Sequence, residues 1–229
     1  MRGVSERLRR FADEQPFERR PILEFMVRAA GELPANAKVA DVGAGDSPYR
    51  ELFDHTEYLA TDWSESVHEA EDVRVVAPAD DLPFGEASFD AVLFTQVLEH
   101  VQDPPGVLAE LLRVLRPGGR LYLSAPLVWE LHELPHDYWR FTEGGLRLLI
   151  EAAGFAEVAV EPRGDSFTTL AQLMRNVPAM IGEAPDGLDG KRREAAEALV
   201  ALSDELAALA PLDTRRLLPL GYCATATRP

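Results

Sequence analysis

The sequence is short of cysteine, of lysine and of long apolar runs. Cys223 is the only cysteine among 229 residues, which excludes an intrachain disulfide and fits a reducing compartment. The lysines are Lys38 and Lys191, beside many arginines, a bias that indicates codon usage rather than chemistry. The apolar runs are too short to cross a bilayer, and residues 1–20 lack the apolar core of a signal peptide. We therefore expect a cytoplasmic protein.

Acidic side chains outnumber basic ones, with a formal net charge of −16. A surface of this sign repels phosphate backbones and anionic lipids, so we expect neither a nucleic-acid partner nor docking on a membrane. Hydrophobic residues make up 46% of the chain, an ordinary share for a globular protein. The length suits one α/β domain with a sizeable core, so residues 1–229 are expected to form a single domain.

Short apolar runs alternate with helical patterns along most of the chain. This alternation indicates βαβ units and a mostly parallel sheet, whose ligands bind at the carboxyl ends of the strands. The expected strands are 38–42, 58–62, 73–77, 89–96, 120–125, 155–161 and 217–227. The expected helices are 5–12, 18–31, 105–115 and 142–153, with another beginning at 49–53.

The pattern changes before the last strand. Two amphipathic helices are expected over 168–181 and 190–209, joined by a loop at 183–190. They predict a helical insertion of about 165–215, in addition to the N-terminal helices within 5–31. A lid over a substrate, an extension of the core and a homodimer face are all compatible with this pattern.

The first strand ends in Asp41-Val42-Gly43-Ala44-Gly45, and Asp62 ends the second. Glycines in such a turn let the backbone approach a ligand, and the second acid can bind two ribose hydroxyls. The turn could hold a dinucleotide or S-adenosyl-L-methionine (SAM). Asp46 would bring a carboxylate close to a pyrophosphate, whereas SAM carries no phosphate, so this residue favours SAM.

Further segments follow in a characteristic order. They are Ala60-Thr61-Asp62-Trp63, Asp81-Leu82-Pro83-Phe84, Ser88-Phe89-Asp90, Val97-Leu98-Glu99-His100-Val101 and Arg113-Val114-Leu115-Arg116-Pro117-Gly118-Gly119. With the glycine turn, they make residues 39–125 resemble the class I SAM-dependent methyltransferases, in the group of ubiquinone-type and small-molecule enzymes. The resemblance implies a Rossmann-like α/β fold with a seven-stranded sheet, SAM as cofactor and methyl transfer to a small molecule.

The resemblance implies which residues hold the methionine part of SAM. The turn Gly43, Ala44 and Gly45 would lie beneath it. Asp41 would hold the turn or, through water, the ammonium group, although it could simply cap the turn. Gln96, at the end of the fourth strand, would face the same end of the cofactor.

The nucleoside contacts follow in the same way. Asp62 would bind the ribose hydroxyls and Trp63 would cover one face of the adenine, unless its indole belongs to the core. Asp80 and Asp81 would run along the adenine edge. The family often has an acid where this chain has Pro78, so Asp80 is the expected substitute for the adenine amino contact.

The loop at 126–141 leaves the fifth strand at its carboxyl end, where an acceptor should bind. If the acceptor is a hydroxyl, a base must take its proton, and an imidazole suits that task near neutral pH. We predict that His136 is this base, with His132 as the fallback. Asp137 could orient the ring of His136, and Asp137 and Tyr138 are expected to contact the acceptor.

Structural roles compete with functional ones in this region. His132 and His136 fit the His-Glu-x-x-His zinc pattern, but Pro135 breaks the helix that the pattern needs, so no metal is expected. Trp139, Arg140 and Phe141 are expected to pack, Arg140 against a buried acid. Glu99 and His100 are expected to be structural, and Pro117 to Gly119 to stop a helix.

The acceptor itself is only suggested. Residues 135–142, with their His-Asp-Tyr-Trp-Arg core, resemble a subgroup of these methyltransferases found among polysaccharide and secondary-metabolite functions. We therefore expect methyl transfer to an oxygen of a sugar or natural product. An N-methyltransferase acting on a small amine and a SAM-binding protein without transferase activity are the alternatives, and a nicotinamide oxidoreductase is a distant third.

Overall fold

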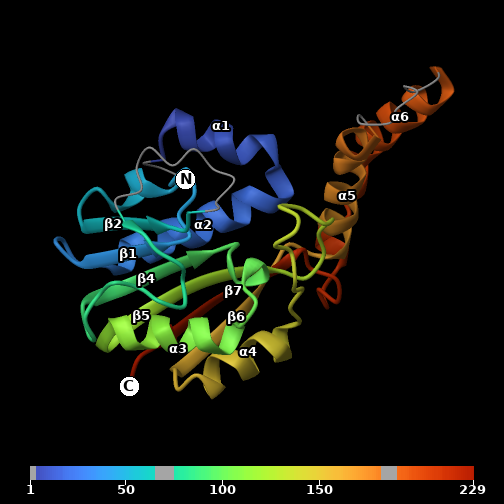
Figure 1. Cartoon of the computed structure of the whole chain (residues 1–229). Coiled ribbons are helices and arrows are strands. Elements are labelled where there is room, and N and C mark those ends of the chain that lie inside the picture. Colours follow the sequence, from blue (N-terminus) through green and yellow to red (C-terminus); the bar gives the residue numbers. More distant parts are fainter. Residues whose placement is uncertain (1–3, 65–74, 182–189) are drawn as a thin grey trace.

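The computed structural model describes residues 4–64, 75–181 and 190–229. Its centre is a seven-stranded sheet in the order β3-β2-β1-β4-β5-β7-β6 (Figure 1). β7 is antiparallel to β5 and β6, and the remaining neighbours are parallel, so the sheet is mixed. The strands are β1 Lys38–Val42, β2 Glu57–Asp62, β3 Val75–Val76, β4 Phe89–Thr95, β5 Leu115–Pro126, β6 Ala156–Arg163 and β7 Gly221–Thr227.

Helices cover both faces of the sheet (Figure 1). α1 (Glu6–Glu14) and α2 (Pro16–Glu32) pack on one face, against Val39, Ala91 and Leu93. α3 (Pro104–Val114) and α4 (Glu143–Ala152) pack on the other, against Val92 and Phe94. Successive strand residues point to opposite faces, so the buried apolar residues of β1 and β4 serve both layers at once. This packing holds the carboxyl ends of β1, β2 and β4 at one edge.

α5 (Ser166–Ile181) and α6 (Gly190–Ala207) lie between β6 and β7 in the sequence and pack against each other. They project away from the sheet, and the base of α5 contacts α2 (Figure 1). A short 3-10 helix, Ala210–Leu212, follows. The expected loop at 183–190 lies outside the described residues except for Gly190, and so do positions 73 and 74 of the expected third strand.

Two expectations about local structure were wrong. The helix expected from 49–53 is a single 3-10 turn, Arg50–Phe53, because β2 already begins at Glu57 and leaves no room for more. α3 ends at Val114 as expected, but residues 117–119 lie inside β5 rather than in a free turn. The backbone of Arg228 pairs there with Gly118 and Gly119, a partner more than a hundred residues away that no local pattern reveals.

Within the described ranges, each helix is too short or too polar to cross a membrane.

Candidate active site

The turn after β1 is built so that backbone, rather than side chains, faces a ligand. Gly43 and Gly45 have φ of +69° and +50°, in the left-handed region that glycine adopts readily. A Cβ on Gly43 would stand 2.6 Å from Val97 Cγ2, so a side chain there would clash. The amide of Ala44, itself buried, donates to the carbonyl of Thr61 at 2.9 Å and ties the turn to β2.

Asp62, the last residue of β2, meets this turn. Its Oδ2 accepts the amide of Gly45 at 3.1 Å, and its Oδ1 accepts the amide of Trp63 at 2.8 Å. A carboxylate oxygen has two acceptor sites, so each oxygen keeps one for a ligand. The carboxylate is therefore held rigidly with two acceptors in a fixed orientation, the arrangement that a pair of neighbouring hydroxyls requires.

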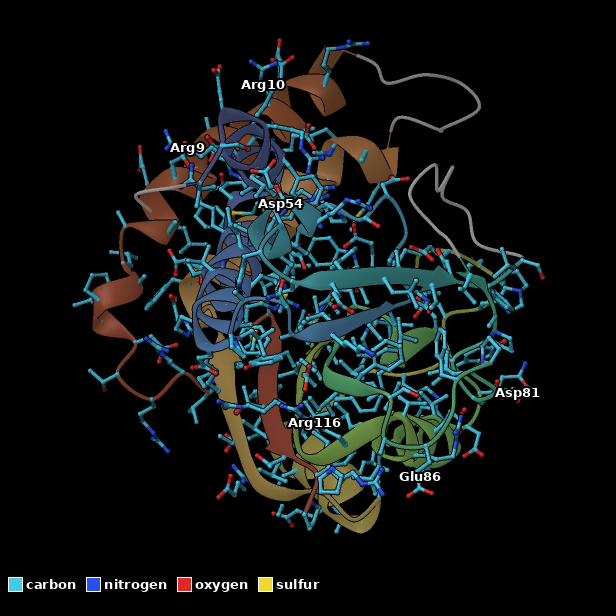
Figure 2. All side chains as sticks on the ribbon, turned by 90° about the vertical axis from the view of Figure 1, so that its left-hand side faces the viewer. Arg9, Arg10, Asp54, Asp81, Glu86 and Arg116 are labelled. Atoms are coloured by element: carbon cyan, nitrogen blue, oxygen red, sulfur yellow. The ribbon has the colours of Figure 1, made fainter. Side chains whose placement is uncertain are left out.

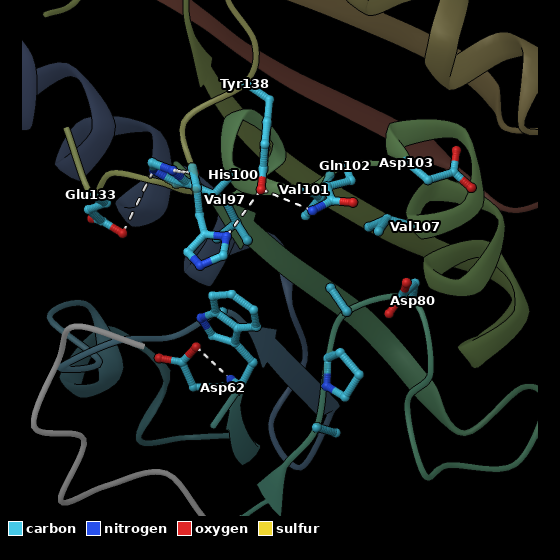
Figure 3. A pocket seen from close by; sticks show the side chains of 16 residues that line it. Asp62, Asp80, Val97, His100, Val101, Gln102, Asp103, Val107, Glu133 and Tyr138 are labelled. Carbon is cyan, nitrogen blue, oxygen red and sulfur yellow. Dashed lines mark hydrogen bonds and ion pairs between the residues drawn. The ribbon is translucent and has the colours of Figure 1, made fainter. Parts of the chain in front are cut away.

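A cavity of about 370 Å³ opens beside the turn (Figure 3). Its volume lies within the range of small-molecule sites, roughly 300–1,000 Å³. Its wall includes Ala77, Pro78 and Ala79 on one side and Val97, Val101 and Val107 on another. The predicted site residues in its wall are Gly43, Asp62, Trp63, Asp80, His136 and Tyr138. Trp63 thus stands at the cavity and only half-buried, rather than in the core.

Asp41 lies deeper, in β1. It is 4% exposed and accepts a hydrogen bond from the hydroxyl of Tyr58. Burial raises the pKa of Asp41 to about 6, the hydrogen bond from Tyr58 opposes this rise, and the nearby charge of Asp62 adds to it. Asp41 is thus placed behind the glycine turn, and its charge changes in the range of neutral pH.

Gln96 and Asp81 lie apart from the cavity wall. Gln96 donates to Ser124 Oγ at 2.9 Å and accepts from Arg163 at 3.3 Å, so its amide takes part in a network between β4, β5 and β6. Asp81 is exposed and points outward at the edge of the molecule (Figure 2). Of the acids expected along the adenine edge, Asp80 is therefore the one beside the cavity.

The loop after β5 brings His136 over the cavity. Its ring packs edge-on against Trp63, with 4.8 Å between centroids and 87° between planes. His136 Nδ1 lies 3.1 Å from the hydroxyl of Tyr138, which also accepts from Gln102 at 3.1 Å (Figure 3). The backbone amide of Tyr138 donates to the carbonyl of Glu99 at 2.9 Å and anchors this part of the loop at the cavity.

Asp137 has a different partner from the one expected. Both of its carboxylate oxygens bind Arg140, at 2.6 and 2.9 Å, and one also accepts the amide of His132. The Arg140 hydrogen bonds lower the pKa of Asp137 to about 2, and burial opposes them. Asp137 therefore braces the loop through Arg140, and the group beside His136 Nδ1 is the hydroxyl of Tyr138.

The packing predictions for the same loop were right in two of three cases. Arg140 pairs with Asp137, whose side chain has no exposed surface, and Phe141 is buried in the core. Trp139 is 43% exposed, so its predicted burial was wrong. Its indole nitrogen donates to the carbonyl of Val101 at 2.9 Å, which holds the ring at the surface.

Glu99 and His100, which were expected to be structural, form a 3-10 turn with Leu98 beside the cavity. His100 lies in the cavity wall, where burial lowers its pKa. Glu99 is completely buried, and burial raises its pKa to about 8. Both of its carboxylate oxygens lack a hydrogen-bond partner among the described residues. The signal available was their position just after β4, at the ligand-binding edge of the sheet.

Part of the chain that forms this site matches a known protein family. Residues 40–123 match the family model described as a methyltransferase domain. Over this span the chain is similar to methyltransferase domains. The matched span runs from β1 through β5 and includes the glycine turn, Asp62 and Trp63.

Two relatives extend the likeness over part of the chain. A malonyl-[acyl-carrier protein] O-methyltransferase from Hahella chejuensis is 34% identical over 139 residues, which are 53% of this chain and 50% of the relative. The ubiquinone/menaquinone biosynthesis C-methyltransferase of Desulfotalea psychrophila is 33% identical over 108 residues, 42% of this chain and 44% of the relative. The chain thus matches about half the length of these curated relatives.

The fold itself is shared more widely. The structure of Haemonchus contortus phosphoethanolamine N-methyltransferase 2 in complex with SAM aligns with a TM-score of 0.58 at 18% identity. The alignment covers 91% of this chain and 52% of that protein. The chain therefore has the Rossmann-like α/β methyltransferase fold with a seven-stranded mixed sheet.

Proposed function

We propose that the protein is a SAM-dependent methyltransferase that acts on a small-molecule acceptor, preferably an oxygen of a sugar or natural product. The observation that carries the proposal is the bond between the amide of Gly45 and Asp62 at the edge of a ligand-sized cavity. It joins a backbone surface for the methionine part to a carboxylate presented for the ribose, as SAM requires.

The cofactor contacts that we propose follow from the positions of the glycine turn and Asp62. Gly43, Ala44 and Gly45 lie under the methionine part, and Asp62 accepts both ribose hydroxyls through its remaining lone pairs. Trp63 covers one adenine face from the cavity wall. Four more residues support the cofactor. Asp80 lies near the adenine edge with Asp81 outside it, and Asp41 and Gln96 lie behind the methionine end.

On the acceptor side we propose His136 as the base. Bound SAM supplies a methyl group already activated for in-line displacement, so the protein's main task is alignment and exclusion of water. His136 then accepts the proton of the attacking hydroxyl. Tyr138, bonded to His136, contacts the acceptor in the cavity wall. His132 remains the fallback base, and Asp137 acts on the acceptor side by holding the loop through Arg140.

The wider organisation is part of the proposal. We propose one domain over residues 1–229, with α5 and α6 as an insertion before β7. The side chain of Asn176 in α5 donates to both carboxylate oxygens of Glu130 at 3.0 and 2.9 Å. This contact ties α5 to the loop that carries His136. It therefore favours a scaffold role for the two helices, in which they position the acceptor loop, rather than a role as a dimer face.

Calorimetry with the demethylated cofactor, S-adenosyl-L-homocysteine (SAH), tests the cofactor. We expect SAH to bind to the full chain and NAD to give no heat. Asp62→Ala should weaken SAH binding by more than about tenfold, because one side chain loses both hydroxyl contacts. The exposed Asp54→Ala is the matched control and should bind normally. Binding of NAD instead of SAH would contradict the proposed cofactor.

Turnover tests the base. Release of SAH would be followed with a panel of monosaccharides, phenols and small amines. With a hydroxyl acceptor from the panel, His136→Ala should reduce turnover by roughly 10²–10⁴-fold while SAH affinity stays nearly unchanged. His55→Ala is the control, since His55 is bonded to the carbonyl of Leu33 at the far end of the chain's first strand. Unchanged turnover in His136→Ala would exclude this residue as the base.

Two outcomes would select the alternatives. Turnover with amines alone, little affected by His136→Ala, would indicate an N-methyltransferase, because an amine needs less help from a base. SAH binding without turnover on any acceptor would indicate a SAM-binding protein without transferase activity. The relatives' names, which include an O-methyltransferase and a C-methyltransferase, leave the acceptor atom to this experiment.

A further inference from the structure

Three side chains converge around His100, which lines the cavity, in a way that methyl transfer alone does not explain. Glu99 and His100 come from the turn after β4, and His132 comes from the loop after β5. One ligand atom from each lies within 4.8 Å of the others. The rings of His100 and His132 stand 4.7 Å apart between centroids. Segments more than thirty residues apart thus bring together two imidazoles and a carboxylate.

A backbone carbonyl holds each imidazole in one tautomer. His100 Nδ1 lies 2.7 Å from the carbonyl oxygen of His136, and His132 Nδ1 lies 3.2 Å from that of Glu130. A carbonyl can only accept, so in each neutral ring Nδ1 carries the proton and Nε2 presents a lone pair. A metal-binding histidine typically donates its other ring N–H to a backbone carbonyl in this way.

Glu99 supplies a deeply buried carboxyl group to the cluster. It has no exposed surface, and neither carboxylate oxygen has a hydrogen-bond partner among the described residues. Oε1 lies 3.9 Å from His100 Nε2 and so points into the cluster. The guanidinium groups that act on its charge, those of Arg140 and Arg163, are each paired with another carboxylate. A carboxyl group in such a place is costly to ionise, and a bound cation stabilises the carboxylate and displaces its proton.

We propose that Glu99, His100 and His132 form a site for a divalent transition-metal cation, with Zn²⁺ as the best fit. Two imidazole nitrogens and one carboxylate oxygen are a donor set of catalytic zinc sites that leave a fourth position open. Ca²⁺ and Mg²⁺ prefer oxygen donors, which argues against them. Bonds of about 2.0–2.2 Å place tetrahedral ligands roughly 3.4 Å apart, so side-chain adjustments of about 1 Å complete the site.

The open position would face the cavity. His100 and Glu133 both line the cavity, and Glu133 Oε2 lies 3.9 Å from His100 Nε2 (Figure 3). Glu133, a water molecule or an oxygen of a cavity ligand could complete the coordination. The site uses His132 from the His-Glu-x-x-His pattern but not His136, whose ring packs on Trp63. It departs from the expectation of no metal, and it does not depend on the proposed function.

Metal binding to the tag-free full chain tests the inference directly. After chelation and removal of the chelator, the protein would be titrated with Co²⁺ alone, and the visible absorption of tetrahedral Co²⁺ recorded. We expect one Co²⁺ per chain, displaced by one Zn²⁺. Glu99→Gln keeps the shape of the side chain and removes its charge. This variant should weaken binding by more than about 100-fold, beyond the 10–100-fold typical of losing an outer partner.

Matched variants make the result decisive. His132→Asn, at a half-buried loop position, should lose the metal as Glu99→Gln does, and it serves if Glu99→Gln fails to fold. His55→Ala and His136→Ala should retain it. Circular dichroism would establish that each variant is folded. The inference is overturned if the parent chain binds no Co²⁺ stoichiometrically, or if binding survives Glu99→Gln and His132→Asn. Loss in His136→Ala with retention in Glu99→Gln would assign the metal to the His132–His136 pair and also overturn it.

Discussion

Arg163 at the end of β6 and Glu18 in α2 form an almost completely buried ion pair, with 2.5 Å between Arg163 Nη1 and Glu18 Oε1. The same guanidinium also donates to the backbone carbonyl of Glu18 and to Gln96 at the end of β4. The pair therefore links the N-terminal helices to two strand ends beside the candidate site. Its bonds are protected from water, so each is electrostatically stronger than in a surface pair, and removing one partner leaves a buried charge unpaired.

Breaking this pair should destabilise the chain strongly. Glu18→Gln leaves the Arg163 charge buried without a counter-ion, and we expect a loss of about 3–5 kcal/mol in the free energy of unfolding. The pair Arg28–Glu161 joins the same two elements but is about half exposed, so Glu161→Gln should cost less than about 1 kcal/mol. Urea unfolding of both variants measures the difference. Equal losses would mean that burial of the Arg163 pair carries no special weight.

Gly43 should tolerate no side chain. In Gly43→Ala the new methyl group would stand 2.6 Å from Val97 Cγ2, in a backbone conformation with φ of +69°. We expect a loss of roughly 2–4 kcal/mol, the sum of overpacking and backbone strain, and at least tenfold weaker SAH binding.

Gly118 offers a matched control for the clash at Gly43. It has a similar φ of +77°, but nothing lies within 4 Å of the position of a Cβ. Gly118→Ala should therefore show the strain alone, about 1 kcal/mol. Adding Val97→Ala to Gly43→Ala should restore part of the stability. If Gly43→Ala and Gly118→Ala lose equal stability, the contact with Val97 is not the cause.

The pKa of about 6 at Asp41 predicts pH-dependent cofactor binding. An ionised Asp41 attracts the ammonium group of SAH, so affinity should rise as pH increases from 5 to 7, by about tenfold. Because the pKa is raised on folding, the neutral carboxyl contributes stability below about pH 4 that is lost as pH rises through 6. Asp41→Asn should therefore be stabilising at pH 7 relative to the parent chain, and less so at pH 4.

Calorimetry and thermal unfolding across this pH range check both effects. Asp54→Asn changes an exposed acid and should retain the parent's pH profile. A profile in Asp41→Asn that matches the parent's would assign the dependence to another group.

Asn176 should act on the acceptor loop rather than on the cofactor. Asn176→Ala removes both hydrogen bonds to Glu130, whose backbone carbonyl also accepts from Arg140. We expect faster amide exchange over residues 126–141 and reduced turnover, with SAH affinity unchanged. Leu170→Ala, at an exposed position of the same helix, is the control. Unchanged exchange in the loop would show that α5 does not hold it.

Much of the fold was predictable because its signals are local. The apolar runs of β1, β2 and β4 and the helical pattern of α3 predict their elements to within a residue or two, since each run must bury its own faces. The failures came from constraints that lie outside the pattern of the segment itself. Residues 117–119 became strand because Arg228 pairs with them, and the helix expected at 49–53 stopped because β2 begins so soon.

The sequence by itself determined the glycine turn and the acid that meets it. Gly43, Gly45 and Asp62 are recognisable because a strand, a turn and a second strand end lie close together along the chain. Only the tertiary structure decided how the loop at 126–141 is used. In the folded chain Asp137 binds Arg140, and the hydroxyl of Tyr138 lies beside His136. His132 lies close to Glu99 and His100. Spacing along the chain does not report such contacts, because they depend on how separate strand ends meet at one edge of the sheet.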